Sequence, residues 1–202
     1  MFAIGSNQRP AVFLDKDGTL VRNVPYNVDP RRIELESTAA EGLAQLAEAG
    51  LALVVVSNQS GVARGFFEEK ALDAVEQRIR QLLEALDIEL AGFYYCPHHP
   101  EGSVAQYRVR CNCRKPAPGM LLSAAQDLGL DLSRSWLIGD ILDDIEAGRA
   151  AGCRAVLIDA GHETEWVSGP RRTPHYIAAN LADAARFIVE ATRQAKIPEV
   201  TL

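Results

Sequence analysis

The sequence lacks several features that would place the protein in a membrane or on a nucleic acid. None of the apolar runs in its 202 residues approaches the ~20 residues that a membrane-spanning helix requires. It also has no long run of basic residues, and its formal net charge is −6. Because contacts to nucleic-acid phosphates need clustered lysine and arginine side chains, this composition argues against a nucleic-acid surface. We therefore expect neither a membrane nor a nucleic acid as a partner.

Internal repeats, low-complexity tracts and interdomain linkers are also missing from the sequence. The first ten residues are too few and too polar for a secretory signal, so a cytoplasmic location is expected. With 48% hydrophobic and 24% charged residues, the chain can bury a full core. We expect residues 1–202 to form a single domain, and the protein to be a monomer.

Short apolar runs alternate with segments of helical periodicity along the chain. The expected strands span residues 11–15, 51–57, 90–96, 135–140 and 153–159, and the expected helices span residues 38–49, 68–86, 118–128, 142–151 and 181–196. Such alternation is typical of parallel βαβ units with helices on both faces of the sheet. The predicted fold class is therefore α/β, with a Rossmann-like parallel sheet and ligands at the carboxyl ends of its strands.

Two details of the helices follow from side-chain patterns. Thr38 and Glu41 have the spacing of a capping box at the start of the first expected helix. In the helix over residues 68–86, the apolar side chains that recur at helical spacing and predict the buried face are Leu72, Val75, Ile79, Leu82 and Leu86.

Polar side chains occur where the expected strands end. Asp15 and Asp17 follow the first strand, Ser57 ends the second, Lys115 comes after the third, and Asp140 ends the fourth. In a parallel sheet, all of these positions lie along one edge. Taken singly, each motif is compatible with an ordinary turn, a loop or a solvated lysine. Because all of them are expected at the same edge of the sheet, they indicate one shared site.

This set of side chains suits phosphoryl transfer. Asp15 can attack phosphorus to form an aspartyl phosphate. Asp17 is expected on the same side of the extended segment, where it can donate a proton to the leaving oxygen and later take one from water, while Lys16 is expected to point away. Lys115 can neutralise phosphoryl charge, and Asp140 can complete a metal shell. Because clustered carboxylates repel one another, we expect a Mg²⁺ ion among them.

The residues after the second strand supply a further part of this site. The Ser57 hydroxyl and the backbone N–H groups that follow it, those of Asn58, Gln59 and Ser60, can hydrogen-bond the oxygens of a phosphoryl group. These residues are therefore predicted to bind substrate.

Three of the four cysteines crowd into 18 residues, and two histidines stand beside the first of them. In a reducing compartment, such a cluster is more typical of a metal site than of disulfides. Cys96 with His98 or His99, and Cys111 with Cys113, can supply three thiolates and one imidazole to a closed tetrahedral zinc site. The spacing alone leaves both histidines open, and the alternatives are reduced cysteines that pack a loop and, less favoured, a redox pair. The fourth cysteine precedes an apolar strand and is expected in the core.

Four short motifs resemble those of the haloacid dehalogenase (HAD) superfamily of phosphatases: DKDGT (15–19), SNQSG (57–61), CRKP (113–116) and GDILDD (139–144). The longer stretches VVVSNQSGVARG, YYCPHHPEGSV and CNCRKPAPGMLL are similar to the D-glycero-D-manno-heptose 1,7-bisphosphate 7-phosphatases. The resemblance covers roughly residues 11–160. It implies a HAD fold without a large cap domain and a zinc-binding loop insertion at about residues 96–114. It also implies a role in carbohydrate metabolism that supplies the heptose of lipopolysaccharide core or related heptosyl nucleotides.

The resemblance also implies a role for each matching residue. Asp15 would be the nucleophile, Asp17 the general acid and base, and Ser57 and Lys115 would hold the phosphoryl group of a small sugar phosphate. Mg²⁺ would bind the carboxylates of Asp15 and Asp140 and the backbone carbonyl of Asp17. The remaining assignments are Arg114 as a contact to the sugar phosphate, residues 23–26, with Asn23 and Tyr26, as the pocket lining, and Cys96, His98, Cys111 and Cys113 as the ligands of a structural Zn²⁺.

The same motifs leave other functions open. A histidinol-phosphate phosphatase resembles this chain in the same motifs and zinc loop, although the long segment between His98 and Cys111 favours the heptose enzyme; another small sugar phosphate is a further alternative. Intact Asp15 and Asp17 disfavour a non-catalytic, zinc-stabilised binding module, and the lack of a cap-sized insertion disfavours a phosphomutase. Ile141 departs from the lysine that typically follows the motif aspartate and contacts substrate in the heptose phosphatases, so the exact substrate and its anomer stay open.

Overall fold

A computed structural model describes residues 8–194 of the chain, and its centre is a parallel sheet of six strands. The strand order is β3-β2-β1-β4-β5-β6. The strands are β1 (Ala11–Leu14), β2 (Ala52–Asn58), β3 (Leu90–Cys96), β4 (Trp136–Gly139), β5 (Arg154–Ile158) and β6 (Tyr176–Ala178). The predicted α/β class with a parallel sheet is confirmed, and β6 is an addition to the five expected strands. Its apolar run, Tyr-Ile-Ala, is only three residues long and so gives a weak strand signal, and Ile177 at its centre is exposed.

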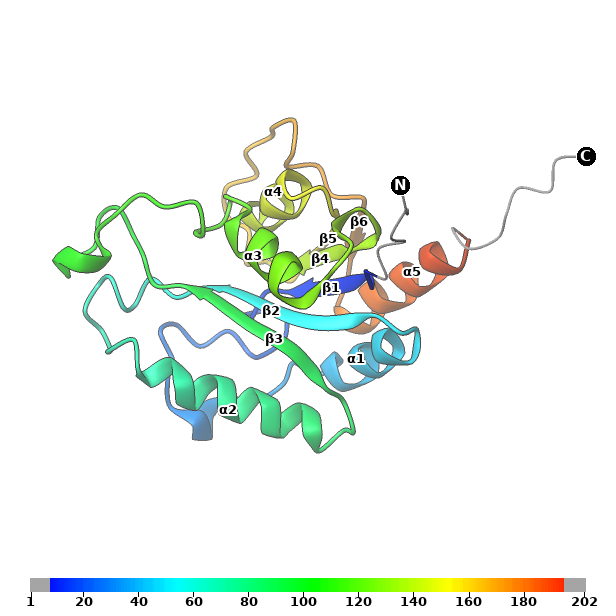
Figure 1. Cartoon of the computed structure of the whole chain (residues 1–202), viewed down its shortest axis with the longest axis horizontal. Helices are drawn as coiled ribbons and strands as arrows, with labels where there is room; N and C mark the ends of the chain where they lie inside the picture. The colour runs from blue at the N-terminus through cyan, green and yellow to red at the C-terminus, as the bar shows by residue number, and fades with distance from the viewer. Residues whose placement is uncertain (1–7, 195–202) are drawn as a thin grey trace, which may run out of the picture.

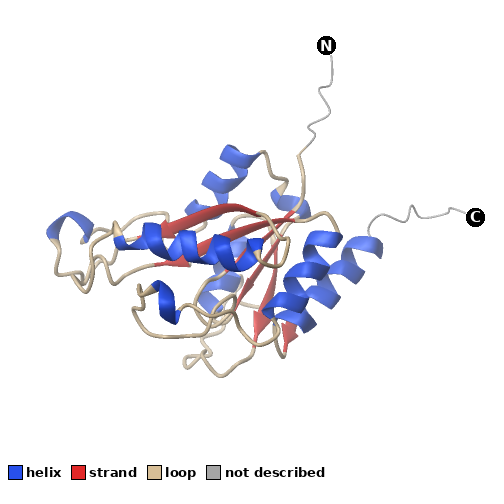
Figure 2. Cartoon of the chain, turned by 90° about the horizontal axis from the view of Figure 1, so that it is seen from below, coloured by secondary structure: helices blue, strands red, loops and turns tan. Residues whose placement is uncertain are grey.

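Helices cover both faces of the sheet, as expected (Figures 1 and 2). They are α1 (Ala39–Glu48), α2 (Ala71–Glu84), α3 (Gly119–Leu128), α4 (Leu142–Ala150) and α5 (Leu181–Gln194). Alternation along β1 divides the core between the two faces. Val12 and Leu14 pack into the apolar cluster that holds α1, α2 and α5, whereas Ala11 and Phe13 pack into the cluster that holds α3. The central strands are therefore buried on both sides, which explains their continuous apolar sequences.

Two predicted details of the helices were wrong. Thr38 does precede α1, but its side chain makes no capping hydrogen bond, because its backbone (φ −111°, ψ 6°) is outside the extended region that a capping residue needs. The Glu41 carboxylate instead accepts a hydrogen bond from Gln45. In α2, the helix ends at Glu84, so Leu83 is buried in place of Leu86, which is 39% exposed. The last two residues of the expected helix over 181–196 lie outside the described residues.

Three irregular segments lie between these elements and bear on function. Residues 15–38 join β1 to α1 and contain the short 3-10 helix η1 (Pro30–Arg32), and residues 97–118 join β3 to α3 and contain η2 (Ala105–Tyr107). Residues 159–175 join β5 to β6. None of these segments forms a cap domain, and no helix among residues 8–194 is long and apolar enough to cross a membrane. A single domain over residues 1–202 stays a prediction.

Candidate active site and metal centres

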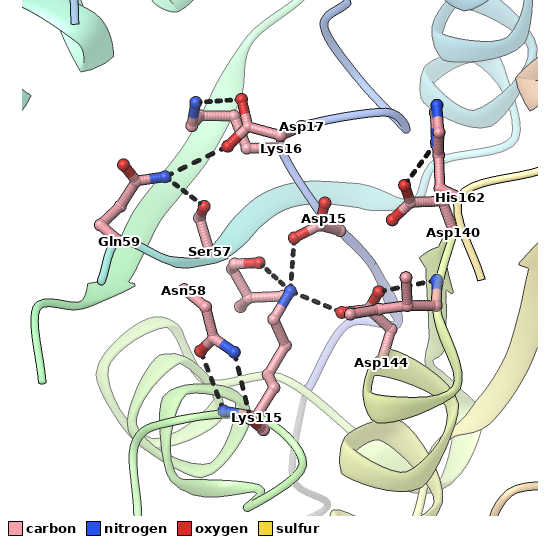
Figure 3. Close-up of polar contacts among 12 residues, drawn as sticks. Asp15, Lys16, Asp17, Ser57, Asn58, Gln59, Lys115, Asp140, Asp144 and His162 are labelled. Atoms are coloured by element: carbon pink, nitrogen blue, oxygen red, sulfur yellow. Dashed lines mark hydrogen bonds and ion pairs between the residues drawn. The ribbon is translucent and has the colours of Figure 1, made fainter. Parts of the chain in front are cut away.

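The carboxyl edge of the sheet brings polar side chains from distant parts of the chain together (Figure 3). Asp15 follows β1 directly, and its backbone N–H donates to the carbonyl of Ile138 in β4 at 2.9 Å. Ser57 lies near the end of β2, and Asp140 follows β4. Lys115 reaches the same edge from the irregular segment after β3. Four of the sequence-predicted positions therefore lie within one small region.

Lys115 is the centre of this arrangement. Its Nζ lies 2.5 Å from Asp15 Oδ1, 2.5 Å from Asp144 Oδ1 and 2.9 Å from the carbonyl oxygen of Val56, and its side chain is only 2% exposed. Burial by itself lowers the pKa of this lysine, but the carboxylates of Asp144 and Asp15 outweigh that effect and raise it. The ammonium group is therefore charged at every physiological pH.

Asn58 fixes the backbone of this lysine. The Lys115 N–H donates to Asn58 Oδ1 at 3.0 Å, and Asn58 Nδ2 donates to the Lys115 carbonyl oxygen at 3.1 Å. A pair of hydrogen bonds to one side-chain amide satisfies both main-chain groups of a residue that lies outside any helix or strand. The end of β2 therefore determines where the Lys115 side chain enters the site.

The two carboxylates that bind the Lys115 ammonium belong to a cluster of three buried carboxylates. Asp15, Asp140 and Asp144 offer oxygen atoms that all lie within 4.8 Å of one another. Burial, followed for Asp140 by the charge of Asp15, raises the pKa of Asp140 to about 7; burial likewise raises the pKa of Asp144 to about 7, against the opposing charge of Lys115. One ammonium cannot balance three ionised carboxylates. A hard dication with oxygen ligands, such as Mg²⁺, fits the remaining charge and the donor set.

Asp144 is a functional candidate that the sequence reasoning missed. It lies in the first turn of α4 and is fully buried, and a side chain on Gly139 would overlap its carboxylate, so glycine is required there. The signal was present in the GDILDD motif, where Asp143 and Asp144 follow Asp140 at the start of a helix. The carboxylate of Asp17 is not a member of the cluster, which leaves its predicted backbone contact to the metal as a prediction.

Asp17 lies on the other side of Asp15, beside Ser57. Its Oδ2 accepts a hydrogen bond from Gln59 Nε2 at 3.4 Å, and the same amide donates to Ser57 Oγ at 2.7 Å. Burial is the largest cause of a raised pKa at Asp17, which favours the protonated carboxyl that a general acid needs. Lys16 was wrongly expected to point away, because its Nζ lies 2.5 Å from Asp17 Oδ1. The strand ends at Leu14 and the chain then turns, so the alternation of an extended segment no longer applies.

A cavity of about 230 Å³ opens beside Asp17. Its lining includes five of the six substrate-binding residues predicted from the sequence: Asn23, Tyr26, Asn58, Gln59 and Ser60. Tyr26 has a left-handed backbone (φ +54°), which is strained for a non-glycine residue, and its ring packs edge-on against Phe66 at 4.6 Å between centroids. Arg114 is half-buried and is not among the residues that line this cavity. The pocket wall is therefore formed by the segments after β1 and β2.

The segment after β3 holds a compact cluster of three thiols and one imidazole. Cys96 Sγ lies 3.5 Å from Cys111 Sγ and 3.2 Å from Cys113 Sγ, and the latter two lie 3.2 Å apart. His98 Nδ1 lies 3.7 Å from Cys96 Sγ and 3.4 Å from Cys113 Sγ. A zinc ion with Zn–S bonds of ~2.3 Å separates its tetrahedral sulfur ligands by ~3.8 Å, so the four side chains need only a small expansion to hold it.

The structure brings His98, and not His99, to these thiols. His99 Nδ1 accepts the N–H of Glu101 at 3.1 Å, and its Nε2 lies 3.2 Å from Arg64 Nη2. Both ring nitrogens of His99 are therefore occupied elsewhere. Burial raises the pKa of Cys96, and burial followed by a hydrogen bond with Cys111 raises that of Cys113, so their thiolates require a cation. The remaining cysteine, Cys153, is buried in the core cluster of the α3 face, as expected.

Comparison with known proteins identifies relatives of this chain. The profile of one family, HAD-hydrolase-like, matches residues 112–184. A D-glycero-beta-D-manno-heptose-1,7-bisphosphate 7-phosphatase of Photorhabdus laumondii subsp. laumondii is 42% identical over 180 residues, which are 89% of this chain and 95% of that protein. The chain belongs to this phosphatase family, within the HAD superfamily. The protein of the same name from Escherichia coli K12 is 44% identical over 142 residues, which are 70% of this chain and 74% of the relative.

This chain has the same fold as solved structures of HAD phosphatases. A HAD-like phosphatase of Mesorhizobium loti superposes with a TM-score of 0.79 at 34% identity, over 92% of this chain and 88% of the other. A D,D-heptose 1,7-bisphosphate phosphatase of B. bronchiseptica, in complex with magnesium and phosphate, superposes with a TM-score of 0.76 at 27% identity, over 90% and 99% of the two chains. The resemblance seen in the sequence motifs is thus confirmed over most of the chain.

Proposed function

We propose that the protein is a Mg²⁺-dependent phosphatase that removes the 7-phosphate of D-glycero-D-manno-heptose 1,7-bisphosphate through an aspartyl phosphate on Asp15. One observation carries this proposal: a buried lysine joins Asp15 to Asp144, with Asp140 beside them and a polar cavity next to Asp17. Membership of a family whose relatives bear this activity in their names supports the substrate.

Asp15 would act as the nucleophile. Its Oδ1 is bound to Lys115, so Oδ2 is the oxygen left to attack phosphorus. The new bond from Asp15 to phosphorus forms as the bond from phosphorus to the C7 oxygen breaks, and Asp17 donates its proton to that departing oxygen. Water then attacks the phosphorus of the aspartyl phosphate, Asp17 takes up a proton from it, and the Asp15 carboxylate is released with inorganic phosphate.

Other residues of the site would stabilise charge during these steps. The Lys115 ammonium, which is bound to Asp15, and the Ser57 hydroxyl near it would contact the phosphoryl oxygens that carry the developing negative charge (Figure 3). A Mg²⁺ ion held by Asp15 and Asp140, with Asp144 beside them, would supply further positive charge to the phosphoryl group. The Asp17 carbonyl is the proposed backbone ligand.

The cavity beside Asp17 would receive the sugar phosphate. Asn23 lines it with an amide group, which can hydrogen-bond sugar hydroxyls in either direction. Asn58 and Gln59 also line it, but the Asn58 amide is bonded to the Lys115 backbone and Gln59 Nε2 to Asp17 and Ser57. Tyr26 lies at the same wall and offers an aromatic face. Arg114 would contact the sugar phosphate from the segment after β3, outside the residues that line the cavity.

Zn²⁺ would bind at Cys96, His98, Cys111 and Cys113 and act on structure. Four protein ligands leave no open position for a water molecule, so such a zinc does not take part in hydrolysis. Its ligands tie the two ends of the segment 97–112 together, and Cys113 lies two residues before Lys115. A zinc ion would therefore hold the segment that delivers the lysine to Asp15.

A comparative phosphate-release assay tests the proposed function. The substrates are the α and β anomers of the heptose 1,7-bisphosphate, a heptose monophosphate and histidinol phosphate, each with Mg²⁺ or with EDTA. We expect the highest kcat/KM for a heptose bisphosphate, and only with Mg²⁺. A higher kcat/KM for histidinol phosphate would transfer the proposal to that reaction, and no Mg²⁺-dependent release from any substrate would contradict a phosphatase.

A further inference from the structure

His162 contacts the carboxylate cluster of Asp15, Asp140 and Asp144, and the proposed mechanism gives this histidine no role. It lies in the segment 159–175, after β5, and its Nδ1 is 2.7 Å from Asp140 Oδ2 (Figure 3). The Asp140 side chain is 6% exposed, and that of His162 is 30% exposed. His162 therefore contacts, through Nδ1, a carboxylate that is almost completely buried.

The chain leaves space for this pair at Gly18. A side chain at that position would overlap both Asp140 Oδ2 and His162 Nδ1. Gly18 also has φ +83°, in the left-handed region that L side chains rarely adopt. The turn after Asp17 thus combines a backbone conformation that favours glycine with a neighbouring histidine–carboxylate contact that requires it.

The segment that carries His162 is anchored to α4. Glu163 Oε2 accepts the backbone N–H of Leu142, the first residue of that helix, at 2.7 Å. A carboxylate is favoured at a helix N-terminus, where the N–H groups lack partners within the helix. Farther along, Arg172 Nη1 donates to Asp143 Oδ1 and Glu146 Oε2, both at 2.9 Å. The helix that carries Asp144 therefore also holds the segment that places His162 against Asp140.

From these contacts we infer that His162 is a positioning residue for the magnesium site: its Nδ1–H donates to Asp140 Oδ2 and directs Oδ1 towards the metal. The inference rests on the proposed Mg²⁺ site. A metal-binding carboxylate only accepts hydrogen bonds, so the ring nitrogen must be the donor, and both the Nδ1–H tautomer and the imidazolium provide that proton. Partners of this kind orient the ligands of a metal, and their loss commonly costs ~10–100-fold in metal affinity.

Mg²⁺ binding to the full chain, measured by isothermal titration calorimetry without substrate, tests this role. We expect His162→Ala to raise the Kd for Mg²⁺ by ~10–100-fold. Thr164→Ala, an exposed position in the same segment, is the matched control and should bind Mg²⁺ like the wild type. In phosphate release, His162→Ala should need more Mg²⁺ for half-maximal rate and approach the wild-type kcat at saturating Mg²⁺.

Two amide variants separate positioning from a general effect on folding. Asn at position 162 places an N–H close to where Nδ1 stands, whereas Gln places it near Nε2, and both are polar and similar in size. We expect His162→Asn to retain most of the Mg²⁺ affinity and His162→Gln to lose it. Equal affinities for these two variants, or an unchanged Kd for His162→Ala, would overturn the inference. A wild type that does not bind Mg²⁺ would overturn the magnesium site itself and the role of His162 with it.

Discussion

The two candidate metal centres differ in where their ligands come from. The carboxylate cluster takes Asp15 from the end of β1, Asp140 from the end of β4 and Asp144 from α4, so it exists only once the sheet has formed. The thiol cluster takes all of its side chains from one stretch, residues 96–113, of which only Cys96 belongs to a strand. The first centre is a product of topology, whereas the second gives order to a segment that has little regular structure of its own.

This difference extends to the expected chemistry of the two ions. The carboxylate cluster is a site of hard oxygen donors beside a cavity, which suits an exchangeable Mg²⁺ that keeps positions for water and phosphate. The thiol cluster closes a tetrahedron and suits a permanently bound Zn²⁺. They meet at Lys115, because Cys113 fixes the chain two residues before it and its ammonium ends between Asp15 and Asp144. Perturbing each centre separately should therefore give distinct effects on turnover and on stability.

The largest expected effect is the loss of turnover in Asp15→Asn. The amide keeps the shape of the side chain but is a very poor nucleophile, so kcat should fall by ~10⁴-fold or more. The substitution loses an ion pair with Lys115 but also removes repulsion with Asp140, so Tm should change by only a few degrees. Steady-state phosphate release and a thermal melt measure both. Activity within tenfold of the wild type would contradict the covalent mechanism.

Chelation should separate the two centres. Washing with EDTA at neutral pH should remove Mg²⁺ quickly and abolish activity, which added Mg²⁺ restores, while about one zinc per chain remains by elemental analysis. Cys111→Ser should lose the zinc, lower Tm and raise KM, since the segment that leads to Arg114 and Lys115 loses its anchor. Cys153→Ser, a buried cysteine far along the chain from the cluster, is the control and should retain zinc. A washed protein without zinc and of unchanged stability would rule out the structural site.

The raised pKa values in the carboxylate cluster predict a smaller effect, on stability. Asp140 and Asp144 titrate near pH 7 in the metal-free protein, mainly because of burial, but near pH 4 when unfolded. Between those values the native state binds more protons than the unfolded chain, so the free energy of unfolding falls as pH rises from ~4 to ~7 and then levels off.

The proposed Mg²⁺ would bind the ionised carboxylates and should therefore raise Tm more at pH 8 than at pH 5. Thermal melts of EDTA-washed protein with and without MgCl₂ across this range give the comparison. In Asp144→Asn the pH-dependent part should shrink, because one of the two titrating groups is gone. An equal increase in Tm at pH 5 and pH 8 would show that these carboxylates do not control metal binding.

The same contrast between local and long-range structure explains what the sequence could predict. The central strands are continuous apolar runs and the motif residues follow their ends, so the parallel sheet and the positions of Asp15, Ser57, Lys115 and Asp140 along its edge could be predicted. The thiol cluster could be predicted because its ligands are close in sequence, although only packing places His98 there while His99 meets Arg64 and Glu101.

Features that depend on how the segments pack could not be predicted. Glu163 and Arg172 hold the segment after β5 against α4, and this packing brings His162 to Asp140. No local sequence pattern predicts that contact. The strand β6 lies at the edge of the sheet beside β5, and its apolar run of three residues is too short to indicate a strand. The direction of the Lys16 side chain could not be predicted from strand alternation, because the strand ends at Leu14.

The smallest expected effect concerns Ile141, which stands between Asp140 and the first turn of α4. The resemblance of the sequence motifs to the heptose phosphatases implies a substrate-contacting lysine at this position. Charge-assisted contacts to phosphate are among the stronger hydrogen bonds, so Ile141→Lys should lower KM for the heptose bisphosphate. The cation would stand at a helix N-terminus, which disfavours positive charge and limits the gain to about three- to tenfold. Because such a contact binds substrate and transition state alike, kcat should stay within about twofold of the wild type. Ile141→Met, similar in size and uncharged, is the control and should leave KM unchanged. A higher KM in the lysine variant, or faster hydrolysis of monophosphates than of the bisphosphate by the wild type, would mean that position 141 marks a different substrate.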